Sequence, residues 1–247
     1  MEGQRQILQT NRLNMKTTLV GYGEIGQSVH EVYKNHEIAI VDGKDDTLEG
    51  KECELLLIAF PYDNNFITYS LLYIKKLRPK VVVIFSTVKT GVTRELQQIS
   101  GVECVHSPVV GIHPNLKEAM LLFPRYIGTR NSIAEVFLEQ TVNGKITIRT
   151  FNDPETTENL KILSTTLYGL NIEYARFVKE ILGSRYEDFK QWNLDYNKLY
   201  KDLGHPEYQK YILYPPEGEI KGHCVMPNAI ILDEMKPNKF TNIILNK

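Results

Sequence analysis

The sequence predicts an α/β protein, with a doubly wound and mostly parallel sheet followed by a smaller all-α domain. Two near-continuous apolar runs, at 54–59 and 81–85, are typical of parallel strands that helices cover on both faces. Expected strands and helices alternate through this part of the chain, as a parallel sheet requires. From Pro154 to about Leu182 the pattern changes to one long helix of unbroken period.

A glycine-rich turn follows the first expected strand. Segment 17–26, Thr-Thr-Leu-Val-Gly-Tyr-Gly-Glu-Ile-Gly, takes an apolar strand into a G-x-G-x-x-G turn. In Rossmann domains such glycines permit a tight turn, a close approach to a pyrophosphate and close helix–strand packing. The next helix then turns its first N–H groups to the phosphates. The alternative to a dinucleotide-binding turn is a glycine turn in a βαβ unit that binds no dinucleotide. We expect a dinucleotide to contact Gly21, Tyr22, Gly23, Glu24, Ile25 and Gly26.

An acidic residue closes the second expected strand, at 37–41. Asp42 lies about 20 residues after the glycine turn, where a carboxylate accepts hydrogen bonds from an adenosine ribose. Because the same carboxylate would repel a 2′-phosphate, the sequence favours NAD over NADP. The other expected cofactor contacts follow the third and fourth strands: Phe60, Pro61, Ser86, Thr87 and Val88.

The remaining elements set the expected domain boundaries. Later strands are expected at 102–106, 125–128 and 145–150, the last of them closing the sheet, with a helix at 132–141. Asp153 before Pro154 is typical of a helix start. Further helices are expected at 185–203 and 229–235, in a tail that is otherwise mostly loop. We therefore expect an N-terminal tail at 1–15, an NAD-binding domain at 16–151 and a helical substrate and dimerisation domain at 152–247.

Composition narrows the possible partners. A formal net charge of −1 gives no general attraction to nucleic acid or membranes. No apolar run approaches the ~20 residues that cross a bilayer, and the first residues lack the apolar core of a signal peptide. The three cysteines have no metal-ligand spacing and are odd in number, which fits a reducing compartment. We expect a cytoplasmic protein with no metal site.

Three further segments add to the glycine turn. They are Ser-Thr-Val-Lys-Thr-Gly-Val-Thr-Arg-Glu-Leu at 86–96, Asn-Leu-Lys-Ile-Leu-Ser-Thr-Thr-Leu-Tyr at 159–168 and Glu-Ile-Lys-Gly-His-Cys-Val-Met-Pro-Asn at 219–228. In order and spacing they resemble the S-T-V-x-x-G-T-T-x-x-L segment, the E-x-x-K-x-x-x-N-x-x-L helix and the G-G-x-C-x-P-x-D loop of UDP-sugar 6-dehydrogenases. The resemblance covers 16–233.

The resemblance implies a reaction and roles for particular residues. That family oxidises a primary alcohol of a nucleotide sugar to a carboxylate with two NAD, through a cysteine-bound thioester. Cys224 would be the nucleophile, and Lys161 would stabilise the developing alkoxide or oxyanion. Thr165 lies one helical turn after Lys161 and could donate its hydroxyl to the substrate.

The chain departs from the family pattern at several positions. Thr165 replaces the family's asparagine, and Asn228 replaces its aspartate, which removes a general base and a negative charge. The family's glutamate after the fifth strand is missing at 107–110, where the sequence is Ser-Pro-Val-Val. We also expect the third domain, which grips the nucleotide of the sugar, to be lacking. We expect the substrate to be an alcohol, with sugars and nucleotide sugars among the candidates.

Two alternatives stay open. Segments 58–63, 86–89, 105–108 and 111–114 resemble prephenate dehydrogenases, which transfer one hydride and use no cysteine. The altered catalytic positions also fit a protein that binds NAD as a sensor or scaffold without turnover.

Four more residues are candidates for substrate contact. His106 and His113 flank the end of the fifth strand, where open α/β sheets bind ligands. Either could accept a proton, since imidazole titrates near neutrality, or could instead be bonded within the protein. Asn171 lies on the long helix, and His223 precedes Cys224, whose thiolate it would favour. The long helix also motivates a homodimer, because members of the family pair through it.

Overall fold

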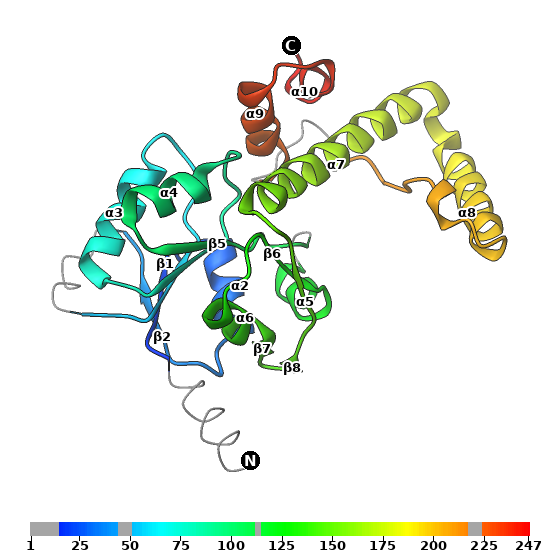
Figure 1. The fold of residues 1–247 in the computed structure, drawn as a ribbon. Coiled ribbons are helices and arrows are strands. Elements are labelled where there is room, and N and C mark those ends of the chain that lie inside the picture. The colour runs from blue at the N-terminus through cyan, green and yellow to red at the C-terminus, as the bar shows by residue number, and fades with distance from the viewer. Residues whose placement is uncertain (1–14, 44–50, 112–114, 217–223) are drawn as a thin grey trace. The chain divides into compact units, whose positions relative to one another are not determined.

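The computed structural model describes residues 15–43, 51–111, 115–216 and 224–247. The chain divides into two compact units, one ending at Lys161 and the other running from Ile162 to Lys247. Figure 1 shows both, coloured along the chain. Each unit is described by itself below.

The first unit is built on a parallel sheet of five strands (Figure 1). In spatial order they are β2 (Ile38–Val41), β1 (Thr17–Val20), β3 (Leu55–Ile58), β4 (Val81–Ile84) and β5 (Glu103–His106). Every residue of β1, β3 and β4 is buried, because helices cover both faces. The predicted α/β class and parallel sheet are confirmed.

Alternate residues of the central strands pack into two separate cores. Leu55 and Leu57 contact the core beneath one set of helices, whereas Leu56 and Ile58 contact the core beneath the other. The first set is α2 (Glu24–Val32), α5 (Leu116–Leu122) and α6 (Ser132–Glu139), and the second is α3 (Phe66–Leu77) and α4 (Val92–Ser100). Figure 1 shows the two sets on opposite sides of the sheet.

The strand order reverses between β1 and β3. From β1 the chain adds β2 on one side, and it then crosses to add β3, β4 and β5 on the other. In open α/β sheets, ligands bind at the carboxyl ends of the strands beside such a switch point. The glycine turn after β1 and the segment after β3 meet there.

The end of the sheet differs from the prediction at 145–150. Lys145 belongs to a short antiparallel hairpin of β7 (Gln140–Thr141) and β8 (Gly144–Lys145), while β9 (Ile148–Thr150) pairs in parallel with β6 (Arg125–Ile127). The expected single strand that closes the sheet is therefore wrong. After a tight turn at Val142 and Asn143, Lys145 pairs back with β7, whereas β9 begins only after residues 146–147 and lies outside the five-stranded sheet. A hydrogen bond from Gly128 N–H to His106 O, at 3.0 Å, links this ladder to β5.

A long helix, α7 (Pro154–Leu182), begins where the sequence predicts. Asp153 Oδ1 accepts a hydrogen bond from Thr156 N–H at 2.7 Å, and Pro154 opens the helix without needing a donor. A short 3₁₀ turn, η2 (Gly183–Arg185), leads to α8 (Tyr186–Asp202), close to the predicted 185–203. The first two turns of α7 belong to the first unit.

The C-terminal part contains more helix than predicted. A 3₁₀ turn, η3 (Pro206–Tyr208), precedes α9 (Val225–Met235) and α10 (Lys239–Leu245). The predicted helix at 229–235 starts earlier, and α10 was missed although Asn238 caps it by accepting hydrogen bonds from Phe240 N–H and Thr241 N–H. Within the described ranges, every helix is too short or too polar to cross a membrane.

Candidate functional site

The glycine turn has the geometry that its three glycines predict. Gly21 has a φ of +91°, and a Cβ there would lie 2.6 Å from Phe60 N. A Cβ on Gly26 would collide with Gly21 O, because α2 packs directly on the turn. Gly23 differs from both, since a Cβ there would meet open space. The packing around the turn leaves no room for a side chain at the first and third glycines, whereas the second leaves the N-terminal end of α2 open.

The first turn of α2 is a place where a phosphate fits. Gly23 is the N-cap of this helix, and no side chain within the described residues caps it. The opening N–H groups of a helix favour a negatively charged neighbour. The open space at Gly23 adjoins those groups, so the turn can hold the pyrophosphate of a dinucleotide.

Asp42 lies beside this turn at the end of β2. Its Oδ1 accepts a hydrogen bond from Tyr22 N–H at 3.2 Å, and its side chain is exposed. The turn and the carboxylate therefore meet in one place, as the ribose and pyrophosphate of one ligand would require. Among the other predicted contacts in the turn, Glu24 is exposed and Ile25 is half-buried against the core.

The ends of β3 and β4 are joined by a hydrogen bond. Ser86 Oγ donates to Phe60 O at 2.6 Å, so the two segments that carry the remaining predicted cofactor contacts lie side by side. Pro61 is exposed and Thr87 half-buried, whereas the side chains of Ser86 and Val88 are buried. Ser86 and Val88 can therefore offer a ligand only their backbone atoms.

His106 is completely buried at the end of β5. Burial, with a smaller effect of Lys161, lowers the pKa of His106 to about 3, so the ring is neutral at physiological pH. Its Nε2 lies 3.2 Å from Ser86 O, which can only accept, so Nε2 carries the proton. Nδ1 then has only a lone pair to offer Thr157 Oγ1, 2.8 Å away, whose hydroxyl also lies 3.0 Å from Pro154 O. Both ring nitrogens of His106 thus contact the protein itself, which is the alternative to substrate contact that Sequence analysis left open.

Lys161 reaches from α7 to the segment after β5. Its Nζ donates to Val109 O at 2.9 Å, and its side chain is half-buried. Thr165, the neighbouring candidate on α7, is half-buried and belongs to the second unit. Helical spacing places the two residues one turn apart.

A buried carboxylate beside Lys161 was not predicted. Glu158 is completely buried, and its two oxygens accept hydrogen bonds from Gly91 N–H and Thr93 N–H at the start of α4. Burial raises the pKa of the Glu158 carboxyl, and the hydrogen bonds oppose this rise. The sequence offered one signal, because Glu158 stands three residues before Lys161, as in the family's E-x-x-K pattern. An acidic residue near a helix start usually faces solvent, so this signal did not predict burial.

Cys224 and Asn228 lie in the second unit, one helical turn apart. Cys224 is half-buried and immediately precedes α9, and Asn228 N–H donates to Cys224 O at 3.3 Å. Asn228 is buried, and its Nδ2 has no hydrogen-bond partner among the described atoms. His113 and His223, the two other candidates, lie outside the described residues.

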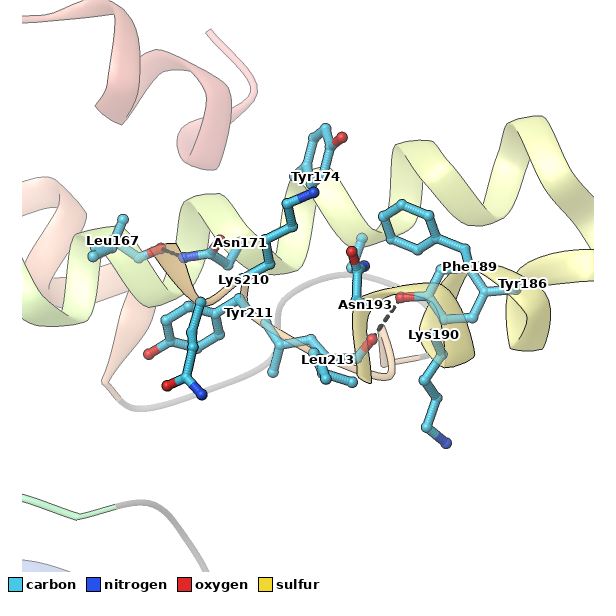
Figure 2. Close-up of a pocket in the computed structure, with 13 residues that line it drawn as sticks. Leu167, Asn171, Tyr174, Tyr186, Phe189, Lys190, Asn193, Lys210, Tyr211 and Leu213 are labelled. Atoms are coloured by element: carbon cyan, nitrogen blue, oxygen red, sulfur yellow. Dashed lines mark hydrogen bonds between the residues drawn. The ribbon is translucent and has the colours of Figure 1, made fainter. Parts of the chain in front are cut away.

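The second unit has a hollow of about 400 Å³ between α7, α8 and the segment that follows them (Figure 2). Asn171, a predicted substrate contact, lines it and donates through Nδ2 to Leu167 O at 2.8 Å. Tyr186 Oη donates to Leu213 O at 2.5 Å on the opposite side. At the same place Asn193 Oδ1 is buried and has no hydrogen-bond partner among the residues that the structure describes. Sequence analysis did not predict this hollow.

The other two cysteines are not reactive candidates. Burial raises the pKa of Cys53 to about 11 and that of Cys104 to about 12, so both thiols stay protonated. No group of three or more His, Cys, Asp or Glu side chains in the part of the chain that the structure describes could hold a metal ion.

Comparisons with known proteins bear on the fold. No protein-family model matches the chain, and no curated protein matches it in sequence. Among solved structures, a UDP-D-ManNAc dehydrogenase from Pyrococcus horikoshii is 17% identical with a TM-score of 0.61, over 93% of this chain and 66% of that one. A UDP-glucose dehydrogenase from the archaeon Pyrobaculum islandicum is 13% identical with a TM-score of 0.64, over 95% and 68%. Psf3 in complex with NADP+ and 2-OPP is 11% identical with a TM-score of 0.58, over 93% and 92%.

These likenesses establish a dehydrogenase-like fold. This chain spans about two thirds of the length of the two sugar-nucleotide dehydrogenases and nearly all of Psf3. At 11–17% identity the likeness shows the fold alone, since one fold hosts many substrates.

Proposed function

We propose that this chain is an oxidoreductase that uses NAD to oxidise an alcohol. The observation that carries the proposal is the joining of the glycine turn to Asp42 through Tyr22 N–H, at the switch point of the sheet. Three groups at this place suit three parts of one dinucleotide. The open end of α2 suits the pyrophosphate, Asp42 suits the adenosine ribose, and the ends of β3 and β4 suit the remainder.

Asp42 supports NAD over NADP. The side chain is exposed, so it is free to accept hydrogen bonds from ribose hydroxyls, and its charge would repel a 2′-phosphate. The structure of Psf3 with NADP+ shows that a protein of similar fold binds the phosphorylated cofactor. The choice therefore depends on Asp42 and its neighbours rather than on the fold.

The substrate is proposed to be an alcohol of a sugar or nucleotide sugar, by likeness to the sugar-nucleotide dehydrogenases. The cofactor, when bound, accepts a hydride. Lys161 would stabilise the negative charge on the substrate oxygen, and the Cys224 thiolate would add to the resulting aldehyde carbon as a nucleophile. With a second NAD as the oxidant, the Cys224 adduct would become a thioester, and water would release the acid and regenerate the thiol.

A single oxidation is the second candidate, and Asn228 favours it. The amide at this position cannot act as a general base, and its unpaired Nδ2 can only donate. A one-step enzyme, as the prephenate-dehydrogenase resemblance implies, would need neither a base here nor a nucleophilic Cys224.

The test is to count the NADH formed per substrate consumed. The panel is UDP- and GDP-sugars, prephenate and small hydroxy acids, with the unmodified chain, Cys224→Ala and the control Cys104→Ala. Two NADH per substrate, lost only in Cys224→Ala, would support the two-step oxidation. One NADH in all three proteins would support the single step. NADH binding without turnover on any compound would favour a sensor or scaffold.

We also propose that two copies of the chain pair through α7. Between Leu163 and Ile181 this helix exposes a row of large apolar side chains at helical spacing, each more than half exposed: Leu163, Leu167, Tyr174, Phe177 and Ile181. Rows of this kind mark interfaces more often than bare surface.

A further inference from the structure

Helix α4 begins without a cap of its own. Its N-cap residue, Gly91, has no side chain and a φ of +94°. The carboxylate of Glu158 takes the place of a cap, with Oε2 accepting from Gly91 N–H at 2.6 Å and Oε1 from Thr93 N–H at 2.9 Å. The cap therefore comes from α7, more than sixty residues along the chain.

The same end of α4 has two more links to α7. Thr90 Oγ1 donates to Asn159 Oδ1 at 2.8 Å, and Arg94 Nη2 donates to Glu155 Oε2 at 2.8 Å. Of the three acceptors, only the Glu158 carboxylate is completely buried, whereas the Arg94–Glu155 pair is partly exposed. Water cannot replace the partner of a buried acceptor. We therefore expect loss of the Glu158 hydrogen bonds to disturb the start of α4 more than loss of the other two links.

These links fix the loop that joins β4 to α4. The loop runs from Ser86 to Gly91, and its other end is also tied to α7, because His106 bonds both Ser86 O and Thr157. Thr87, half-buried in the middle of the loop, has neither link. The first turns of α7 thus hold both ends of the segment that carries part of the proposed cofactor site.

The strand order says which part of the cofactor this loop would meet. Asp42, at the end of β2, and Ser86, at the end of β4, are three strand spacings apart, ~14 Å. With the adenosine ribose at Asp42 and the pyrophosphate at α2, the nicotinamide half extends toward β4.

We propose that Glu158 is a positioning residue that holds the Ser86–Gly91 loop against the nicotinamide half of the bound dinucleotide. This rests on the proposed function, since it requires NAD to bind at the glycine turn. Glu158 does not touch the cofactor. It acts by capping α4, and this cap fixes the position of the C-terminal end of the loop and limits its movement.

Two ligands separate this role from a general effect on folding. NADH contains both halves of the dinucleotide, whereas ADP-ribose lacks the nicotinamide. In Glu158→Gln the amide group keeps one acceptor oxygen and turns an N–H toward the other backbone donor, so one charge-assisted hydrogen bond is lost. We expect NADH affinity to fall about tenfold while ADP-ribose affinity changes less than about twofold. Calorimetric titration measures both.

Glu155→Gln is the matched control. It lies one turn earlier on the same helix and breaks the partly exposed pair with Arg94 of the same α4, so both affinities should stay within about twofold. Gly91→Ala changes the donor residue of the cap instead of the acceptor. Its Cβ meets open space but strains the left-handed backbone, and it should reproduce the selective loss of NADH affinity.

The outcomes distinguish the two proposals. If the unmodified chain binds neither NADH nor ADP-ribose, the proposed function and this inference both fail. If it binds both, and Glu158→Gln and Gly91→Ala weaken the two ligands equally or not at all, the positioning role fails and the proposed function stands. Thermal unfolding of each variant shows that it is folded, and if Glu158→Gln does not fold, Gly91→Ala decides.

Discussion

The backbone N–H of Tyr22 donates a hydrogen bond to Asp42 Oδ1 at 3.2 Å. This contact joins the turn after β1 to the end of β2, two places that are 20 residues apart in sequence. Among the described residues it leaves the second carboxylate oxygen and the exposed face of the side chain for a ligand. A carboxylate held in this way is oriented before the ligand arrives, which reduces the entropy lost on binding.

Replacement of Asp42 by alanine should therefore weaken NADH binding strongly. Hydrogen bonds to a charged acceptor contribute about 1.5–3 kcal/mol, so we expect affinity to fall about ten- to a hundredfold. NADPH should lose less, or gain, because the charge that repels its phosphate is gone. Titration of NADH and NADPH fluorescence measures both affinities. Asp195→Ala, on α8 in the other unit, is the control, and equal affinities in Asp42→Ala and the control would contradict the ribose assignment.

Gly23 and Gly26 should respond differently to the same substitution. A Cβ at position 23 meets open space, so Gly23→Ala should fold normally and yet fill the place proposed for the phosphates. A Cβ at position 26 collides with Gly21 O, so Gly26→Ala should be destabilised by about 1–3 kcal/mol. Urea unfolding and NADH titration of the two variants separate folding from binding. Unchanged NADH affinity in Gly23→Ala would contradict the cofactor site.

The sheet was predictable from the sequence because its signals are local. Runs such as Val81–Ile84 are apolar at every position, and only strands covered on both faces need that pattern. The hairpin at Gly144 was missed because β7 and β8 have two residues each, too few to show a period. The start of α9 was missed because its hydrophobic residues are not confined to one face, so no helical period stands out near Val225.

The candidate site could be predicted only where its residues are contiguous in sequence. The glycine turn is such a case, because its three glycines and the helix after it are contiguous. Glu158 was missed because its partners lie more than sixty residues away, and nothing in its local sequence shows that it is buried. His106 was ambiguous for the same reason, since its partners Ser86 and Thr157 come from distant segments.

The burial of His106 predicts a pH dependence of stability. Burial lowers its pKa to about 3, so between about pH 3 and the unfolded value of 6.5 the unfolded chain binds a proton that the folded chain does not. This contribution to stability is complete above pH 6.5 and falls as the pH drops, by up to about 1.4 kcal/mol per pH unit.

His106→Gln should reduce that slope. The amide can still donate to Ser86 O and accept from Thr157, but it does not titrate. Urea unfolding at pH 4.5, 5.5 and 7.5 compares the variant with the unmodified chain. His36, whose pKa burial also lowers, is present in both proteins and serves as the internal control, since its share of the slope should remain. Equal slopes in the two proteins would show that folding does not lower the pKa of His106.

The exposed row on α7 predicts a dimer in solution. Phe177 and Ile181, four residues apart, are 56% and 61% exposed, which is unusual for neighbouring large apolar side chains on one helix. We expect sedimentation equilibrium at micromolar concentration to give twice the chain mass of 28.5 kDa.

Placing two like charges on a helix face that meets its own copy should oppose pairing, so Phe177→Glu with Ile181→Glu should give the single-chain mass. Glu180→Gln, an exposed change between them, should leave the dimer intact. A single-chain mass for the unmodified protein would rule out pairing through α7 at that concentration.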